Sequence, residues 1–476
     1  MAILDQSFSA QNFEVIFNML NRKGKVDITR MSTDYQQAVA DMKNTYAQIR
    51  DQKRVKRSDW TNDDKSRFDS LNTGLKDLNK RKIDALRANL QAIADTVNSR
   101  VFRFVMNKHQ YDGHEEFTIE KTSLAVDYAI CQLQYNIKQT FQLETAGRHT
   151  IMLSLKRLLN TKSPLYIIRT DVSGFFESIS QDMLYKKLND NSLLSYKSKA
   201  FIKAIMQEFE EIKDINIISK DLGIPRGVGI SSMLSEIFMK DIDRLIKTRR
   251  EVIYYVRYVD DIFILLSSIH PFDSIEDYYA DLTMLFSDYG LTLKSITDTK
   301  CQLIDYVKVR PSSKNFEYLG YRLELRYSRT GLELKYGLSQ RKKDKIKERI
   351  DNAFTHYENL SKISIKQARR DLLDSLKLIT GNIRLHNSKS GIKTGLYYNN
   401  NLIDEIGLVD LDILTRYLHG KILNVYADAF VSINNMDDFS RKLQDRINNI
   451  DLRQCWLQRC MYDLPVTRVS DIMIWL

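Results

Sequence analysis

The chain has 476 residues, enough for two to four domains with a large hydrophobic core. Its formal net charge of +11 and its pI near 9.1 favour a polyanionic partner, nucleic acid first and an acidic membrane surface second, with a merely solvated basic surface as the alternative. No stretch reaches about 18 uninterrupted apolar residues, so we expect no membrane-spanning segment.

Proline and glycine are scarce, at 5 and 17 residues, which predicts a helix-rich chain with few long irregular loops. The four cysteines (Cys131, Cys301, Cys455 and Cys460) are scattered, and the closest pair has neither the spacing nor the histidine partners of a zinc site. Reduced cysteines are typical of the cytoplasm, and we therefore expect a cytoplasmic protein.

Residues 1–100 have a charged, helical pattern and predict an N-terminal helical extension. Apolar residues recur at steps of three and four along residues 68–97, which indicates a long amphipathic helix packed on the rest of the chain rather than a free coiled coil. The basic cluster at residues 53–57 could touch phosphate, and a solvated charge run is an equally good interpretation.

A buried-strand pattern at residues 165–170 ends on Asp171. A glycine-containing turn with Phe175 and Phe176 follows, and then a helix that begins near Ser180. An aspartate at the end of a strand can project its carboxylate beyond the sheet edge, although a lone aspartate there more often caps a helix or forms a turn. Only its combination with other motifs points to chemistry.

The one glycine-rich loop of the chain, residues 223–229, contains Arg226 and Gly227 and precedes an amphipathic helix over residues 234–245. Glycines before a helix let the backbone approach a ligand closely and present N–H groups to an anion. The loop has neither the Gly-Lys-Ser/Thr ending of a P-loop nor the glycine spacing of a dinucleotide fingerprint.

The strongest signal is the stretch 255–266, which reads Tyr-Val-Arg-Tyr-Val-Asp-Asp-Ile-Phe-Ile-Leu-Leu. Two apolar runs flank a three-residue connection, Val259-Asp260-Asp261, and predict an antiparallel hairpin with adjacent carboxylates at its tip. Neighbouring carboxylates at the end of a buried sheet repel each other and lose solvation. A divalent metal ion with oxygen ligands would supply the positive charge that such a site needs.

Beyond the hairpin, the pattern predicts a helix over residues 275–289, strands at 291–293 and 301–307, and a strand or hairpin over 316–323. From Ser339 the chain is helical in pattern to its end.

Taken in order, the strand-terminal aspartate with two aromatics, the Gly-Pro-Arg-Gly loop that opens a helix and the Asp-Asp hairpin resemble the palm of a reverse transcriptase over residues 145–325. Within that class the chain is similar to the bacterial abortive-infection and defence-associated enzymes. The segments that carry this closer resemblance are residues 21–24, 232–243, 257–261, 381–382 and 395–400. Retron and intron-encoded enzymes usually carry glutamine where Arg226 stands and Ser-Pro where Val228-Gly229 stand, so the chain departs from their pattern.

The resemblance implies an α+β fold with three parts. An N-terminal helical extension over residues 1–100 precedes right-hand polymerase fingers and palm over residues 101–325. A helical, repeat-like C-terminal domain over residues 326–476 takes the place of a thumb. No appended nuclease is expected, since no second carboxylate cluster follows residue 340.

The resemblance also implies the site. Asp171, Asp260 and Asp261 would be catalytic and hold two Mg²⁺ ions, with the Val172 carbonyl as a further ligand and Mn²⁺ as an alternative ion. Phe176 occupies the position of an aromatic against the sugar 2′ carbon, with core packing as the alternative for it and the favoured interpretation for Phe175. The remaining implied contacts are Arg226, Gly227, Lys300 and Arg148 with the nucleotide, and Leu319 and Gly320 with the primer end.

The implied function is a Mg²⁺-dependent DNA polymerase of antiphage defence that extends a protein or nucleic-acid primer, with or without a conventional template. The expected partners are deoxynucleoside triphosphates, the DNA product, a non-coding RNA and further copies of the chain, but no membrane. One alternative is a retron- or intron-type reverse transcriptase that copies a dedicated non-coding RNA. The other is a non-catalytic RNA-binding scaffold, against which the presence of all three carboxylates argues.

Overall fold

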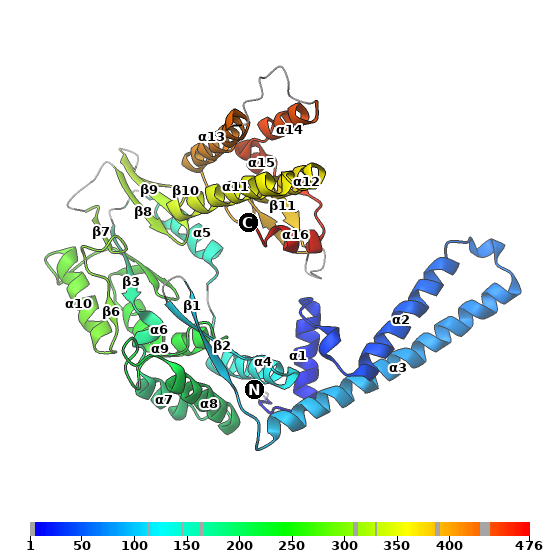
Figure 1. Ribbon diagram of the computed structural model, residues 1–476. Coiled ribbons are helices and arrows are strands. Elements are labelled where there is room, and N and C mark those ends of the chain that lie inside the picture. The colour runs from blue at the N-terminus through cyan, green and yellow to red at the C-terminus, as the bar shows by residue number, and fades with distance from the viewer. Residues whose placement is uncertain are drawn as a thin grey trace. The chain divides into compact units, whose positions relative to one another are not determined.

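The computed structural model describes residues 5–111, 114–144, 146–161, 163, 165–307, 313–328, 331–385, 391–428 and 438–476 (Figure 1). Contacts divide the chain into two units. Unit one comprises Met1–Glu144, Gly174–Arg244 and Ser287–Leu291, and unit two comprises Thr145–Ser173, Leu245–Phe286 and Thr292–Leu476. These units do not follow the three domains expected from the sequence (1–100, 101–325 and 326–476), which stay a prediction.

Unit one is built mainly of helices. They are α1 (Ala10–Arg22), α2 (Thr33–Gln52), α3 (Asn62–Asn98), α4 (Leu124–Phe141), α6 (Phe175–Ser178), α7 (Gln181–Asp190), α8 (Tyr196–Ile212) and most of α9 (Ser231–Lys247), with a hairpin of β1 (Met106–Tyr111) and β2 (His114–Ile119). The long amphipathic helix expected from the sequence is confirmed as α3, along which α2 packs (Figure 1). It begins at a capping box, in which Thr61 and Asp64 satisfy each other's backbone N–H groups.

The central sheet of unit two is antiparallel, in the order β4-β5-β3-β6, with β7 also paired to β3. Its strands are β3 (Tyr166–Ser173), β4 (Val252–Tyr258), β5 (Asp261–Leu266), β6 (Thr292–Leu293) and β7 (Gln302–Asp305). Helix α10 (Ile275–Ser287) contacts β3, since the hydroxyls of Tyr279 and Thr170 lie 2.7 Å apart. These elements confirm the strands and the helix that the sequence predicts after the hairpin.

The rest of unit two carries a second antiparallel sheet and a set of helices on one continuous hydrophobic core. The sheet is β8 (Ser313–Tyr318), β9 (Tyr321–Ser328) and β10 (Gly331–Leu338). The helices are α5 (Arg148–Leu158), α11 (Gln340–Ser361), α12 (Ile365–Thr380), α13 (Glu405–Asp428), α14 (Asp438–Asn448), α15 (Leu452–Leu457) and α16 (Val466–Ile472), with a small sheet of β11 (Asn382–Arg384), β12 (Lys393–Gly395) and β13 (Met461–Tyr462). Ser339 caps α11 as expected.

The architecture confirms the predicted α+β class, with a polymerase-like sheet followed by a helical region. The predicted end of β3 was wrong. Strand β3 does not stop at Asp171 but runs on to Ser173, because Val172 and Ser173 pair with Leu293 and Thr292 of β6. In the part of the chain described, no helix is both long enough and apolar enough to cross a bilayer.

Candidate active site

The hairpin of β4 and β5 turns through two residues, Val259 and Asp260. The expected three-residue connection is therefore wrong by one residue, because Asp261 already pairs with Tyr258 as the first residue of β5. On its other side Asp261 lies opposite Asp171 of β3. Residues directly opposite in an antiparallel pair have Cα atoms about 4.5–5.5 Å apart, so two carboxylates meet at one end of the sheet.

The turn holds Asp260 in a fixed place beside them. Val259 has a φ of 60°, a strained conformation for a β-branched residue. Two bonds hold this turn: Arg257 Nη1 donates to the Val259 carbonyl at 2.7 Å, and the Val172 N–H donates to the Asp260 carbonyl at 3.2 Å. Strain of this kind is concentrated at functional sites, where the surrounding structure maintains it.

Two basic side chains contact the opposed carboxylates. Lys300 Nζ lies 2.6 Å from Asp171 Oδ2, and Arg169 Nη2 lies 3.0 Å from Asp261 Oδ1. Asp171 is only 2% exposed, and its second oxygen, Oδ1, is buried without a hydrogen-bond partner among the described residues. A buried oxygen left without a partner is costly, and its presence indicates that a cation or donor belongs there.

Burial raises the pKa of Asp261 to about 6. The charge of Arg169 opposes this rise, while the neighbouring Asp171 and Asp260 carboxylates add to it. Burial lowers the pKa of Lys300, but its hydrogen bond to Asp171 and the carboxylates around it prevail, and the net direction is upward. The Lys300 ammonium group therefore stays protonated beside carboxylates that repel one another.

Arg169 is a member of this site that the sequence reasoning missed. It is 6% exposed, and besides its ion pair with Asp261 it donates from Nη1 to the Lys300 carbonyl. One signal could have found it: a charged residue inside an apolar strand pattern, two positions before Asp171, has to be paired because a buried lone charge is costly.

The oxygen donors suit a hard divalent cation, because carboxylates and carbonyls are the ligands that Mg²⁺ takes. As the side chains stand, no three Asp, Glu, His or Cys residues in the described part of the chain converge into a metal-binding group. Lys300 and Arg169 each form an ion pair with one of the two opposed carboxylates. Asp171 Oδ1, which has no hydrogen-bond partner among the residues described, lies opposite Asp261 and nevertheless fits such an ion.

A second set of the expected residues lies together in unit one. The Arg226 guanidinium is 5.4 Å from the centre of the Phe176 ring and 2.9 Å from Glu177 Oε1. Phe175 is buried, as its core interpretation predicts, whereas Phe176 is partly exposed. Part of the Phe176 side chain is therefore accessible to solvent.

Gly227 has a φ of 95° and lies against β2. A Cβ added to it would lie 2.7 Å from the carbonyl oxygen of Phe117, whose N–H donates to the Arg226 carbonyl at 2.7 Å. Only glycine allows both the backbone conformation and this close approach.

Replacement of Gly227 by alanine is expected to lower the free energy of unfolding by about 1–3 kcal/mol, because the methyl group meets backbone that cannot move aside. Urea unfolding measures it. Gly74→Ala, in the middle of α3 with nothing within 4 Å of the added Cβ, is the control and should stabilise by about 0.5–1 kcal/mol. Equal stability of Gly227→Ala and wild type would contradict the expectation.

Leu319 and Gly320 form the turn between β8 and β9, and both have positive φ, 46° and 77°. Such a two-residue turn matches the twist of a hairpin. Arg148 lies beside it, since a Cβ on Gly320 would be 3.6 Å from Arg148 Nη1. Lys342 also lies there, with Nζ 4.3 Å from the centre of the Tyr321 ring. The roles of Arg148 at the triphosphate and of this turn at the primer end stay predictions.

Burial, with a smaller effect of the Arg148 charge, lowers the pKa of Lys342 to about 8, and its Nζ donates to Asn400 Oδ1 at 2.6 Å. Between pH 8 and 10.5 the folded chain then binds fewer protons here than the unfolded chain, so this group makes folding more stable as pH rises. The difference in the free energy of unfolding between wild type and Lys342→Met should therefore increase by roughly 1–3 kcal/mol in favour of wild type from pH 8 to pH 10.5. Unfolding titrations at several pH values measure it. A difference that stays constant with pH would contradict this, and the exposed Lys345→Met is the control.

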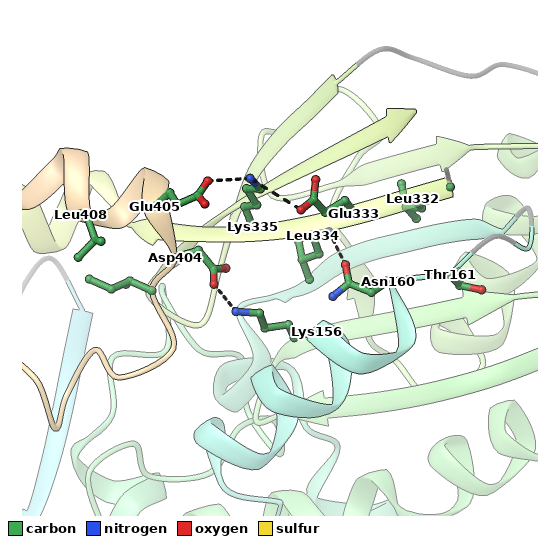
Figure 2. Close-up of a pocket in the computed structure, with 12 residues that line it drawn as sticks. Lys156, Asn160, Thr161, Leu332, Glu333, Leu334, Lys335, Asp404, Glu405 and Leu408 are labelled. Atoms are coloured by element: carbon green, nitrogen blue, oxygen red, sulfur yellow. Dashed lines mark hydrogen bonds and ion pairs between the residues drawn. The ribbon is translucent and has the colours of Figure 1, made fainter. Parts of the chain in front are cut away.

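A cavity of about 760 Å³ elsewhere in unit two is lined by two lysines and three acidic residues, which form ion pairs with one another (Figure 2). Lys156 pairs with Asp404, and Lys335 Nζ lies 2.9 Å from Glu405 and 3.7 Å from Glu333. These pairs join α5, β10 and the start of α13, which is a structural role.

An antiparallel sheet with two opposed carboxylates, a third at the adjoining turn and a lysine against them defines the palm of a nucleic-acid polymerase. Residues 71–323, more than half of the chain, match the family model described as "Reverse transcriptase (RNA-dependent DNA polymerase)". The chain therefore belongs to the reverse transcriptase family and is an RNA-directed DNA polymerase. Enzymes of this family act on nucleotides and generally use divalent metal ions.

Two solved structures illustrate what the fold is similar to. Apo telomerase from Candida tropicalis is 14% identical, with a TM-score of 0.36 over 79% of this chain and 67% of its own. Telomerase from Candida albicans in complex with the TWJ fragment of telomeric RNA is 11% identical, with a TM-score of 0.35 over 75% of this chain and 65% of its own. Among curated proteins, none matches the chain.

Proposed function

We propose that this reverse transcriptase is a Mg²⁺-dependent DNA polymerase of bacterial antiphage defence. It adds deoxynucleotides to a protein or nucleic-acid primer without needing a conventional template, and it works in the cytoplasm as a homo-oligomer. The observation that carries the polymerase chemistry is the register of Asp171 against Asp261, with Asp260 on the adjoining strained turn. The defence role rests on the resemblance of its motifs to the abortive-infection enzymes.

In this proposal Asp171, Asp260 and Asp261 hold two Mg²⁺ ions, and the Val172 carbonyl is a further ligand. When bound, the ions lower the pKa of the attacking hydroxyl and neutralise charge on the transferred phosphoryl group. Arg169 orients the Asp261 carboxylate through their ion pair. A buried arginine suits this role because its rigid fork also binds the carbonyl of Lys300.

Lys300 exchanges its partner in the reaction. Its side chain is 53% exposed while Asp171 is almost buried, so the lysine can leave the carboxylate and meet an incoming triphosphate without disturbing the sheet. Its raised pKa keeps it charged for that contact. In the absence of nucleotide, the same ammonium group compensates the carboxylate pair.

Phe176, stacked by Arg226, selects deoxyribose by excluding a 2′ hydroxyl. We expect Phe176→Ala to reduce the preference for deoxynucleotides over ribonucleotides by on the order of 10–100-fold, measured as the ratio of kcat/KM values for the two. Phe175→Leu, in the buried neighbour of Phe176, is the control and should lower stability but leave the preference unchanged. If Phe176→Ala keeps the wild-type preference for deoxynucleotides, the Phe176 ring contributes to packing only.

A challenge of bacteria with a panel of phages tests the defence role. Cells that carry the wild-type chain or Asp288→Asn, an exposed aspartate at the end of α10, should resist at least one phage, and cells with Asp260→Ala should not. Resistance that survives Asp260→Ala would refute a defence that works through polymerisation and would favour the RNA-binding scaffold. A structured RNA that co-purifies with the chain and is required for synthesis would favour the retron or intron type instead.

A further inference from the structure

An ion pair in unit one, between Glu177 of α6 and Arg226 of the glycine-rich loop, borders the Phe176 ring. Arg226 Nη2 lies 2.9 Å from Glu177 Oε1 and 3.3 Å from Oε2, and Nε lies 3.2 Å from Oε1. The carboxylate therefore holds the guanidinium by two of its three nitrogens, a contact for which the planar fork of arginine is suited. The side chains of Glu177 and Arg226 are only 22% and 29% exposed, which strengthens the pairing relative to one in bulk water.

This pair is not needed to connect the two segments that carry it, because their backbones are already joined. The Ile224 N–H donates to the Phe176 carbonyl at 2.8 Å, and the Gly223 N–H donates to the Ile179 carbonyl at 2.8 Å. The Gln181 side-chain amide adds a bond to the Gly223 carbonyl at 2.9 Å. What the ion pair adds is therefore a fixed orientation of its two side chains.

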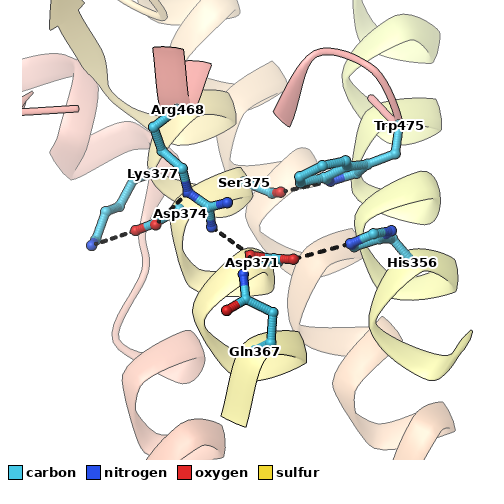
Figure 3. Close-up of polar contacts among 8 residues, drawn as sticks. All are labelled: His356, Gln367, Asp371, Asp374, Ser375, Lys377, Arg468 and Trp475. Carbon is cyan, nitrogen blue, oxygen red and sulfur yellow. Dashed lines mark hydrogen bonds and ion pairs between the residues drawn. The ribbon is translucent and has the colours of Figure 1, made fainter. Parts of the chain in front are cut away.

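An arginine–carboxylate network in unit two has the structural role that the pair of unit one lacks (Figure 3). Arg468 of α16 lies 2.6 Å from Asp371 and 3.1 Å from Asp374, both on α12. His356 of α11 contacts the second Asp371 oxygen at 3.2 Å. These contacts join three helices to one another.

Arg226 also keeps one nitrogen available to a ligand. Nη1 forms no hydrogen bond or ion pair with any residue in the part of the chain that the structure describes. The guanidinium lies 5.4 Å from the centre of the partly exposed Phe176 ring. Because the Glu177 carboxylate compensates the guanidinium charge, the pair presents an oriented N–H donor without net charge beside this ring.

We propose that Glu177 is a positioning residue for the incoming nucleotide. It fixes the Arg226 guanidinium beside Phe176 and compensates its charge, so that Arg226 donates to an uncharged acceptor of the nucleotide instead of binding its triphosphate. A glutamine would also supply a neutral donor here, and retron and intron-encoded enzymes usually carry glutamine where Arg226 stands. The inference rests on the proposed polymerase function and deepens it, because it makes a residue outside the metal site necessary for nucleotide binding.

The test is a cycle of Glu177→Gln, Arg226→Gln and the double variant, with kcat and KM measured for a deoxynucleotide on a supplied primer–template. Arg226→Gln leaves a carboxylate without its cation, which repels a triphosphate, so KM should rise by about 10-fold. Glu177→Gln leaves a mobile, uncompensated cation and should reduce kcat/KM by about 10-fold. The double variant removes both charges and keeps a neutral donor, so its kcat/KM should lie within about 3-fold of wild type.

A double variant that is more active than either single variant supports the proposal. Wild-type kcat/KM in Glu177→Gln would overturn it, and so would single losses that simply multiply in the double variant. Asp374→Asn, which removes a carboxylate from Arg468 in unit two, is the control and should lower the melting temperature without changing KM. If kcat/KM falls in this control as much as in Glu177→Gln, the loss reports on stability and the proposal is wrong.

A second measurement separates this inference from the proposed function. Fluorescence of a mant-labelled deoxynucleotide measures its Kd for each full chain without turnover, so the cycle has a result even if the wild-type chain makes no DNA. Coupling between Glu177 and Arg226 in Kd, together with no incorporation by wild type, would refute the polymerase function but retain the positioning role. Normal incorporation by wild type without coupling in either kcat/KM or Kd would retain the polymerase and overturn the role of Glu177.

Discussion

Replacement of Asp171 by asparagine is expected to lower the rate of deoxynucleotide incorporation by on the order of 10³-fold or more. Asparagine keeps the shape of the side chain but removes the charge opposite Asp261, and it gives the buried Oδ1 position no anionic oxygen with which to hold a cation. The measurement is incorporation of labelled deoxynucleotide onto a supplied primer–template with saturating Mg²⁺.

The control for this variant is Asp288→Asn, which removes one exposed carboxylate from the end of α10. It should retain wild-type rates. Circular dichroism and a thermal melt establish that Asp171→Asn is folded, so that a loss of rate reports on chemistry. A loss of incorporation rate of less than about 10-fold would show that Asp171 is not a ligand on which the catalytic metal ions depend.

Arg169→Met is expected to lower the free energy of unfolding by about 3 kcal/mol, near the lower end of the range for breaking a buried ion pair. The variant leaves the Asp261 carboxylate and the Lys300 carbonyl without their donors. The lower end applies because the Asp261 side chain is still 25% exposed and water can solvate it in part. Urea unfolding at pH 7 provides the measurement.

A double variant separates the ion pair from simple loss of packing. Arg169→Met/Asp261→Asn removes both charges, so it should be more stable than the sum of the two single changes implies, with a coupling of about 1–3 kcal/mol. Arg169→Lys keeps the charge but not the forked geometry and should lie between wild type and Arg169→Met. Additive single changes would mean that the 3.0 Å contact does not stabilise the fold.

The fold class and the hairpin were predictable because their signals are local. Two apolar runs on either side of a short connection identified β4 and β5, and a serine before a helical pattern placed the starts of α7 and α11. What failed was the exact end of elements: Asp261 was assigned to a turn although it pairs with Tyr258, and β3 was ended two residues early. Those boundaries are decided by hydrogen bonds to strands distant in sequence.

The site was predictable only in part for the same reason. Asp171, Asp260 and Asp261 are identified by their neighbours in the sequence, and the structure brings them to one end of the sheet. The ion pairs of Lys300 with Asp171 and of Arg169 with Asp261 span more than ninety residues, and no local pattern indicates them.

The most direct test of the proposed function is incubation of the purified protein with each labelled deoxynucleotide and Mg²⁺, without template or primer, beside Asp260→Ala. Products are sized after treatment with protease or with RNase. We expect wild-type protein alone to make DNA whose migration shifts after protease, the result of a protein-primed polymerase. DNA that disappears when RNase precedes the reaction would establish copying of a bound RNA instead. No Asp260-dependent incorporation, even on a supplied primer–template, would contradict the account.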